Sequence, residues 1–379
     1  YTAGSSVTTG GSNTFFGHQA GDAVTTGEQN VIIGKSAGTE ATTASYNVLI
    51  GTNAGDALTT GTQHTAVGHN ALSAVTTADS LVAIGSGALA ANTGGLRNTA
   101  LGVAALETNT TENNNTAIGW YALKLASTAS ESIAVGAYAG QAITTGDQNV
   151  VMGYNAGGAL TTGGSNIAMG AYALDAAVSG SHNTALGNAA LSAATGTYNT
   201  ALGSAAMQTT TTGDRSTALG YGALYDNTTG ANNTAVGMSA LENNTTASAN
   251  TAVGSNVMSA NTTGSSNTAV GYYALDACTT GSDNTAVGRD ALGNHTTGAE
   301  NTAVGRDALS DNTTAARNTA VGYRALYLNT TDNNNTAVGW ECGKTCNGST
   351  DLTAVGAYAA SLMTTGDYNT AMGQAAMYN

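Results

Sequence analysis

Histidine, cysteine and carboxylate side chains, the groups that most often perform catalysis or bind metals, are sparse in this sequence. The 379 residues include five histidines, three cysteines and 23 Asp+Glu. The acidic residues do not recur in the glycine-and-aspartate pattern of calcium-binding repeats. Neither a Gly-x-Ser-x-Gly elbow nor a phosphate-binding loop occurs. We therefore predict no catalytic residue, no cofactor and no metal site.

These groups are spread over a repeat that occupies almost the whole chain. The string Asn284-Thr-Ala-Val-Gly288 returns with small changes every 17 residues, except for one interval of 16 between Gly187 and Gly203. We number the places of the repeat from its glycine, and the chain holds 22 copies. A period this short, without apolar residues three and four apart, predicts stacked coils of short strands and turns.

Stacking limits what the histidines can do. His18 and His69 hold the same place of the repeat but lie three coils apart, roughly 14 Å at the spacing of β-strands. Nitrogen ligands lie about 2 Å from a bound metal, so these two cannot share one. We expect exposed positions for all five histidines, His18, His64, His69, His182 and His295.

Composition and charge argue against several classes of partner. The net charge is −14 with 9 Lys+Arg, and affinity for nucleic acid depends on basic side chains. The chain has no apolar run of about 18 residues that could be inserted in a membrane. It also has no proline, which is compatible with uninterrupted strand pairing.

Three places of the repeat predict a packed interior. Place four is alanine in 20 of 22 copies, as a narrow coil requires. Place five is Leu or Met in most copies and glycine in six, and in those six place eight becomes apolar or small. We interpret this exchange as one cavity filled from either side, which a packed core tolerates. In many leucine copies place eight is polar, as in Asn92, Asn227, Asn244 and Asn312.

Asparagine holds place fourteen in 17 of 22 copies. In coils about 4.8 Å apart, these amides can form a hydrogen-bonded ladder. The alternative is that they bind sugar. Thr-Thr-Gly at places nine to eleven predicts a turn whose glycine has a positive φ, as at Gly27, Gly146 and Gly264.

The strand itself covers places fifteen to seventeen. In Val31-Ile32-Ile33 and similar copies it is wholly apolar, which indicates burial on both faces. One face would look into the coil, and the other, with Val, Ile or Leu at place seventeen, would need a partner such as a bundle of identical chains. The structural residues that we expect to maintain this architecture are Asn233, Ala235, Gly237, Ala240, Leu241, Asn250, Gly254, Asn267, Gly271, Asn284, Val287 and Gly288.

The strand Asn-Thr-Ala-Val-Gly followed by x-x-Ala-Leu resembles the head repeats of trimeric autotransporter adhesins. The string Asn227-Thr-Thr-Gly-Ala-Asn-Asn-Thr-Ala-Val-Gly237 also resembles repeats of phage tail-fibre and bacterial surface-fibre proteins. The resemblance covers residues 13 to 379. It implies a left-handed β-roll in which three chains pack along an axis. Because the repeat is longer than the usual adhesin repeat and no stalk, anchor or chaperone domain follows, we expect a shaft or a fragment.

Further side chains are candidates for structural or surface contacts. Cys342 and Cys346, at places four and eight of one coil, would form either a disulfide or two buried free thiols. Arg289-Asp290 and Arg306-Asp307 repeat in adjacent coils and predict diagonal or interchain ion pairs. The same places collect aromatic residues, which would pack between chains or bind sugar. The expected surface contacts are Trp120, Tyr121, Tyr272, Tyr273 and Trp340.

Together these patterns predict an all-β, parallel β-solenoid (β-roll) of about 22 coils of 17 residues, trimeric and, by the resemblance, left-handed. Residues 1–12 would form a lead-in or partial coil. Residues 13–379 would form one continuous array, with a 16-residue coil at 187–203.

The expected function is that of a non-enzymatic extracellular, cell-surface or virion fibre, an adhesin or tail-fibre shaft that attaches through repeated weak contacts. Its partners would be further copies of itself and a host surface glycan or protein, with no nucleic acid and no membrane insertion. The alternatives are an ice-binding solenoid that uses Thr-Thr columns such as Thr262-Thr263, and a carbohydrate-active β-helix.

Overall fold

The computed structural model describes residues 2–378, in two compact units, Tyr1–Ser192 and Ala193–Asn379. Every regular element in the described part of the chain is a strand of three residues, one for each copy of the repeat, and none is a helix. This confirms the predicted all-β, parallel solenoid.

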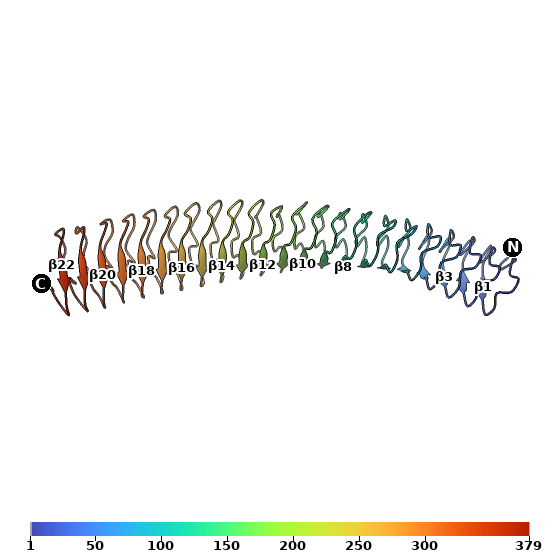
Figure 1. Cartoon of the computed structure of the whole chain (residues 1–379), viewed down its shortest axis with the longest axis horizontal. Helices are drawn as coiled ribbons and strands as arrows, with labels where there is room; N and C mark the ends of the chain where they lie inside the picture. The colour runs from blue at the N-terminus through green and yellow to red at the C-terminus, as the bar shows by residue number, and fades with distance from the viewer. Residues whose placement is uncertain (1, 379) are drawn as a thin grey trace. The chain divides into compact units, whose positions relative to one another are not determined.

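In the first unit the strands follow one another in chain order (blue to green in Figure 1). Each pairs in parallel with the next without a shift, so that Thr65 lies opposite Val82. Ahead of the first strand, Gly4 N and Thr8 N donate to the carbonyl groups of Ala20 and Thr25, both at 2.9 Å. The strands are β1 (Thr14–Phe16), β2 (Val31–Ile33), β3 (Val48–Ile50), β4 (Thr65–Val67), β5 (Val82–Ile84), β6 (Thr99–Leu101), β7 (Thr116–Ile118), β8 (Ile133–Val135), β9 (Val150–Met152), β10 (Ile167–Met169) and β11 (Thr184–Leu186).

The second unit repeats this arrangement (yellow-green to red in Figure 1). Equivalent residues again lie opposite one another, as Thr234 does to Thr251 and Val236 to Val253. The strands are β12 (Thr200–Leu202), β13 (Thr217–Leu219), β14 (Thr234–Val236), β15 (Thr251–Val253), β16 (Thr268–Val270), β17 (Thr285–Val287), β18 (Thr302–Val304), β19 (Thr319–Val321), β20 (Thr336–Val338), β21 (Thr353–Val355) and β22 (Thr370–Met372).

The interior of each coil is narrow and is filled from the same places of the repeat. On each strand the middle residue faces inward and its two neighbours face outward, because side chains alternate along a strand. The structural residues predicted from the sequence are buried, apart from the corner glycines and Val287. In the coil that begins at Gly237, the side chains that are at most 2% exposed are Ala240, Leu241, Asn244, Ala247, Asn250 and Ala252.

The corners of the coil are formed by residues with positive φ at places one, three, five and thirteen. Place one requires glycine: Gly288 has a φ of 133°, and an added Cβ would lie 2.6 Å from the carbonyl oxygen of Gly305 in the next coil. Residues with side chains occupy the other corners, as at Leu241 (φ 53°) and Ala249 (φ 60°). The predicted positive φ at place eleven is wrong for Gly27, Gly146 and Gly264, because the left-handed residue of this turn lies at place thirteen and place eleven points inward.

The asparagines of place fourteen form a ladder inside the coil. Asn250 Oδ1 accepts a hydrogen bond from Asn267 N at 2.8 Å, and Asn250 Nδ2 donates to the Gly264 carbonyl at 2.9 Å. Amides also bond directly, since Asn284 Nδ2 donates to Asn267 Oδ1 at 3.2 Å. The buried amides therefore tie each coil to its neighbour and also satisfy the backbone of the turn.

A second asparagine ladder occupies place eight, where sequence reasoning identified only a polar alternative to an apolar residue. Asn244 Nδ2 donates to Asn227 Oδ1 at 2.8 Å, and Asn261 Nδ2 donates to Asn244 Oδ1 at 2.9 Å. In the first unit Asn92 bonds to Asn109 in the same way, at 3.1 Å. Place eight is thus an inward position even when it is polar.

Two histidines belong to these ladders, which corrects the expectation that all five are exposed. His64 and His295 are 1% and 0% exposed. His64 Nδ1 accepts from Leu81 N at 3.3 Å, as an asparagine oxygen does at place fourteen. His295 Nε2 lies 2.8 Å from the Gly298 carbonyl, as the amide nitrogen does at place eight. Each imidazole replaces an amide in the interior, whereas His18, His69 and His182 are exposed.

The glycines of place five leave room for more than one neighbour. A Cβ on Gly140 would lie 2.9 Å from Ile143 Cδ1 at place eight, as the predicted shared cavity requires. It would also lie 3.1 Å from Val151 Cγ2, in the middle of a strand. A Cβ on Gly55 would lie 3.0 Å from Leu49 Cδ2, again in the middle of a strand. The cavity is therefore shared by three places, five, eight and sixteen.

Candidate binding surfaces

The outward face of the sheet is an exposed surface of mixed chemistry. At place seventeen, Val253, Val287 and Val304 are each 36% exposed. Threonines at place fifteen lie beside them on the same face, and in the second unit both columns continue from strand to strand. The predicted need for a partner on this face therefore corresponds to an uncovered column of apolar side chains.

The Thr-Thr columns at places nine and ten do not expose both hydroxyl groups. Thr262 Oγ1 donates to the Thr279 carbonyl of the next coil at 3.0 Å, and Thr245 Oγ1 donates to the Thr262 carbonyl at 3.1 Å. The second threonine of each pair, such as Thr263, is exposed. One hydroxyl column thus connects the coils, and the other remains on the surface.

In the first unit, the aromatic residues form the predicted line within a single chain. Trp120 contacts Tyr121 and Tyr138, with ring centroids 4.8 and 4.9 Å apart. The row continues from Tyr138 to Tyr154 at 5.9 Å and from Tyr154 to Tyr172 at 5.4 Å. Because Trp120 and Tyr154 are about half exposed, the row offers ring faces or edges to the surface.

The second unit has shorter aromatic groups. The centroids of Tyr272 and Tyr273 lie 4.2 Å apart, and those of Tyr323 and Trp340 lie 4.3 Å apart. Tyr272 and Trp340 are about half exposed. These predicted contact residues form separate pairs, not a continuous row.

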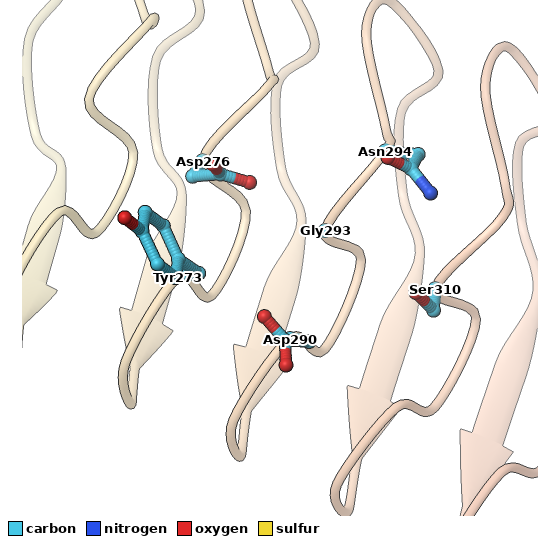
Figure 2. A pocket seen from close by; sticks show the side chains of 6 residues that line it. All are labelled: Tyr273, Asp276, Asp290, Gly293, Asn294 and Ser310. Atoms are coloured by element: carbon cyan, nitrogen blue, oxygen red, sulfur yellow. The ribbon is translucent and has the colours of Figure 1, made fainter.

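A hollow of about 300 Å³ opens beside the first of these pairs. Figure 2 shows that three successive coils contribute its lining. Sequence reasoning selected Tyr273 as a surface contact but did not identify the hollow. The sequence feature that marks the hollow is at place six, where glycine follows aspartate and precedes serine in successive coils. The lining residues are Tyr273, Asp276, Asp290, Gly293, Asn294 and Ser310.

The polar groups of the hollow are mostly hydrogen-bond acceptors. Partial burial raises the pKa of Asp276 above its usual value, and the nearby Asp290 carboxylate raises it further. Asn294 Nδ2 donates to Asp311 Oδ1 at 3.0 Å. The side-chain oxygen of the same residue, Asn294 Oδ1, has no hydrogen-bond partner in the described chain. Ser310 is 9% exposed, and its hydroxyl makes no hydrogen bond to a described residue.

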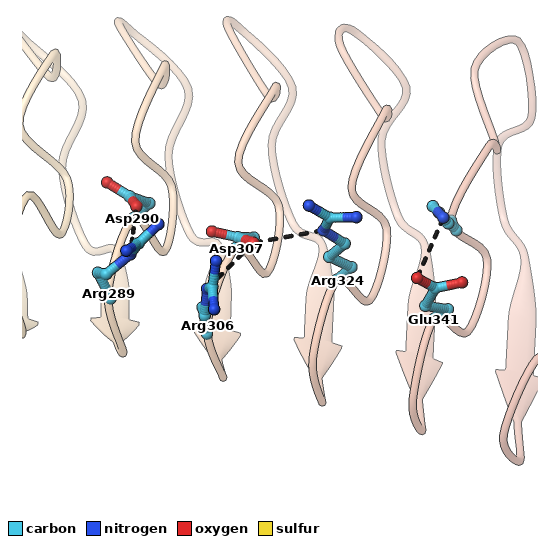
Figure 3. A network of polar contacts seen from close by, with 7 residues as sticks. Arg289, Asp290, Arg306, Asp307, Arg324 and Glu341 are labelled. Carbon is cyan, nitrogen blue, oxygen red and sulfur yellow. Dashed lines mark hydrogen bonds and ion pairs between the residues drawn. The ribbon is translucent and has the colours of Figure 1, made fainter.

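A row of ion pairs adjoins the hollow (Figure 3). Arg289 Nε lies 2.8 Å from Asp290 Oδ2 within one coil. Asp307 Oδ2 lies 3.5 Å from Arg306 Nε and 3.3 Å from Arg324 Nε of the next coil. The pairs therefore form within a coil and along a column, not diagonally as expected. The Arg289–Asp290 pair, which is open to solvent on both sides, contributes only about 0–1 kcal/mol.

The cysteines add no bond and no metal site to these surfaces. Cys342 and Cys346 are both buried free thiols, and Cys278 is a third. Burial raises the pKa of Cys342 to about 11 and that of Cys346 to about 12, so both remain protonated near neutral pH. Across residues 2–378, no three His, Cys, Asp or Glu side chains are grouped to hold a metal ion. The same residues include no helix that could cross a membrane.

Comparisons with protein-family models, with curated proteins and with solved structures found no match. The functional conclusions below therefore rest on the geometry of these surfaces.

Proposed function

We propose that this chain is a non-enzymatic structural fibre of an extracellular, cell-surface or virion assembly. In this proposal identical chains, three about a common axis, pack through the outward face of the sheet. The observation that carries the proposal is the uncovered apolar column at place seventeen, exemplified by Val253, Val270 and Val287. Exposed apolar columns of this length mark interaction surfaces more often than free surface.

The free energies of burial and association indicate why chains need the whole column to associate. Fully burying a valine or leucine gains about 1.5–3 kcal/mol, so covering the exposed third of such a side chain gains roughly 0.5–1 kcal/mol. A few coils cannot offset the loss of translational and rotational freedom, which costs about 4–15 kcal/mol. A column of about ten strands gains roughly 5–10 kcal/mol and reaches this range. Association should therefore require many coils in register.

The other surfaces support attachment through many weak contacts. The aromatic row, the outer threonine column and the hollow each lie on the outside of stacked coils. Sites linked on one assembly gain avidity because each later contact forms at a high effective concentration. A host surface glycan or protein is the partner that we propose for these contacts.

The mass of the native particle, measured by light scattering after size exclusion, tests the chain packing. We expect three times the mass of the 37.1 kDa chain. A mass of one chain at micromolar concentration would contradict packing through the sheet face.

Ice binding is a second candidate, and one observation favours it. Threonine and valine side chains alternate outward on an in-register sheet, as in Thr285 and Val287. This arrangement repeats hydroxyl and methyl groups at the spacing of strands, about 4.8 Å. It differs from the predicted Thr-Thr surface, where one of the two hydroxyl groups is used within the stack.

The two candidates compete for the same face of the sheet. A fibre that buries this face between chains cannot present it to ice. Thermal hysteresis by a particle with the mass of one chain would favour ice binding. A trimer without thermal hysteresis would favour the fibre.

A further inference from the structure

We infer that the hollow lined by Tyr273, Asp276 and Ser310 binds a neutral pyranose ring. The inference deepens the proposed attachment function and rests on it, because it names a class of ligand for one surface of the coils. Figure 2 shows the lining side chains on neighbouring coils of the second unit.

The hollow lies where the coil that begins at Gly288 lacks a side chain at place six. Asp276, Gly293 and Ser310 hold this place in successive coils. The three atoms nearest to a Cβ on Gly293 would be backbone atoms of Asp290, with the first at 3.3 Å. Gly293 is also absent from the residues with positive φ, so the backbone conformation does not require glycine here. The absent side chain is what leaves room for a ligand.

The Ser310 hydroxyl group is available to a ligand that occupies the hollow. Ser310 is 9% exposed, and its Oγ makes no hydrogen bond within the described chain. Its oxygen is not one of the fully buried unpaired atoms, so water reaches it in the free protein and a ligand that displaces this water must replace the hydrogen bond. Ser310 also lines the hollow, so a molecule seated there can reach this hydroxyl.

The remaining polar groups select a ligand that donates hydrogen bonds. Asp276 has no ion-pair partner in the described chain, and the Asn294 carbonyl oxygen is also free to accept. A ligand rich in hydroxyl groups can donate to both oxygens and exchange a hydrogen bond with Ser310. Sugars with carboxylate groups are disfavoured, because the Asp276 carboxylate, which has no ion-pair partner in the described chain, would repel them.

Tyr273 supplies the apolar part of the site. Its ring is held against Tyr272, with centroids 4.2 Å apart. A pyranose has a face of C–H groups that can pack on such a ring while its edge hydroxyls reach polar side chains. The volume, about 300 Å³, is at the lower end of the range for small-molecule sites, about 300–1,000 Å³. A divalent cation would not use the aromatic ring, and Arg289 already neutralises Asp290 at 2.8 Å.

The test uses the whole chain and the neutral methyl glycosides of glucose, galactose and mannose, observed by saturation-transfer NMR and titration. We expect transfer to at least one glycoside, with a dissociation constant in the millimolar range, because small ligands gain limited affinity. Gly293→Gln fills the hollow and should weaken this binding at least about tenfold by steric exclusion. The matched control is Ala90→Gln, the same new side chain at place six of a coil in the first unit, which should leave binding unchanged.

Further variants and probes make the outcome decisive. Ser310→Ala and Asp276→Asn should each weaken binding several-fold, with circular dichroism unchanged. No transfer to any of the glycosides, or equal transfer with Gly293→Gln, would overturn the inference. So would a response to calcium chloride alone that Gly293→Gln abolishes, since this would identify a cation site.

The native mass separates this inference from the proposed fibre. A trimer that binds none of the glycosides would retain the fibre proposal and refute the sugar site. A monomer whose glycoside binding depends on Gly293 would refute the packing of chains and retain the sugar site.

Discussion

Asn250 illustrates how this protein builds a core from polar residues. Its side chain is fully buried, yet its oxygen accepts from the next strand and its nitrogen donates to a turn. Each such hydrogen bond contributes about 0.5–1.5 kcal/mol net, whereas a buried group left unpaired costs about 1–3 kcal/mol. A coil this narrow therefore favours amides that bond along the stack.

The buried histidines predict a loss of stability in mild acid. Burial lowers the pKa of His64 and of His295, so the unfolded chain binds protons that the folded chain does not. Their contribution should be complete above the unfolded pKa of about 6.5 and should be lost as the pH falls below it. The urea concentration at the unfolding midpoint of the wild type should therefore be lower at about pH 5.5 than at about pH 7.5.

The double variant His64→Asn/His295→Asn checks the source of this pH dependence. It restores the residue type usual in both ladders and should flatten the change between the two pH values. His69→Asn, at an exposed position, serves as the control and should keep the wild-type dependence. An unchanged dependence in the double variant would assign it to other groups.

Residue identity alone did not reveal which histidines are buried. The sequence predicts a ladder at place fourteen and an exposed His64, whereas His64 is a buried member of that ladder with a different side chain. The sequence places position eight at a shared cavity, but it does not show that polar residues there, such as Asn227 and Asn244, form a second hydrogen-bonded ladder. Only the coordinates show that an amide and an imidazole supply equivalent hydrogen bonds at these places.

The coil is the structural element of this fold, and each coil bonds mainly to its two neighbours. Removing one whole repeat, Gly237 to Val253, should leave the remaining columns in register because Val236 would be followed by Gly254. We expect a folded protein of unchanged circular dichroism per residue and a smaller hydrodynamic radius, since repeat stability is approximately a sum over neighbours.

The control for this deletion removes half a coil, residues 237–244. It shifts every inward place of that coil, so apolar residues move outward and amides lose their partners. This variant should be destabilised or should not fold. Equal stability of the two deletions would show that register along the stack is unimportant.

Because places five, eight and sixteen share one cavity, we expect the effects of substitutions at Leu49 and Gly55 on stability to be coupled. Leu49 is 1% exposed, so Leu49→Ala should cost about 2–5 kcal/mol by leaving a cavity. Gly55→Leu should be destabilising by about 1–3 kcal/mol in the wild type, because its Cβ would press on Leu49. In the Leu49→Ala background the new leucine fills the cavity, so the double variant should be more stable than the sum of the single effects.

Urea unfolding of all four proteins measures this coupling, expected at about 0.5–3 kcal/mol. The control combines Leu49→Ala with Gly140→Leu, whose Cβ would meet Ile143 and Leu123, not Leu49. Those two changes should be additive. Additivity of the Leu49 and Gly55 changes would refute the shared cavity.

Much of the coil could be predicted from the sequence because its period is strict. Alanine at place four, asparagine at place fourteen and the strand at places fifteen to seventeen each follow from residue type and spacing. The conformation of the corners could not be predicted, because left-handed positions held by Leu241 and Ser239 have no propensity signal. The hollow was missed because Gly293 departs from the repeat only by lacking a side chain.

At the scale of the whole molecule, the outward sheet face should determine whether chains associate. Val270→Lys, Val287→Lys and Val304→Lys together place three cations in one column, one strand apart. Their desolvation between chains is unfavourable, so the proposed trimer should dissociate into folded single chains. Light scattering gives the mass, and circular dichroism checks the fold.

A second variant, with three lysines at positions away from this face, is the control. Thr263→Lys, Thr280→Lys and Thr297→Lys lie at the exposed place ten and should leave the mass unchanged. Dissociation by both triple variants would indicate a general effect of charge. Since each chain carries a net charge of −14, association should also strengthen with added salt, which screens repulsion between chains.

In-register stacking also bears on how such a gene can change. Recombination between two copies of the repeat adds or removes whole coils in frame, and the sequence on either side of the junction keeps its register. The inserted or lost segment begins and ends at equivalent places, so both hydrogen-bonded ladders are rejoined at the junction. The length of such a protein can therefore change in steps of one coil while the surfaces of the remaining coils stay the same.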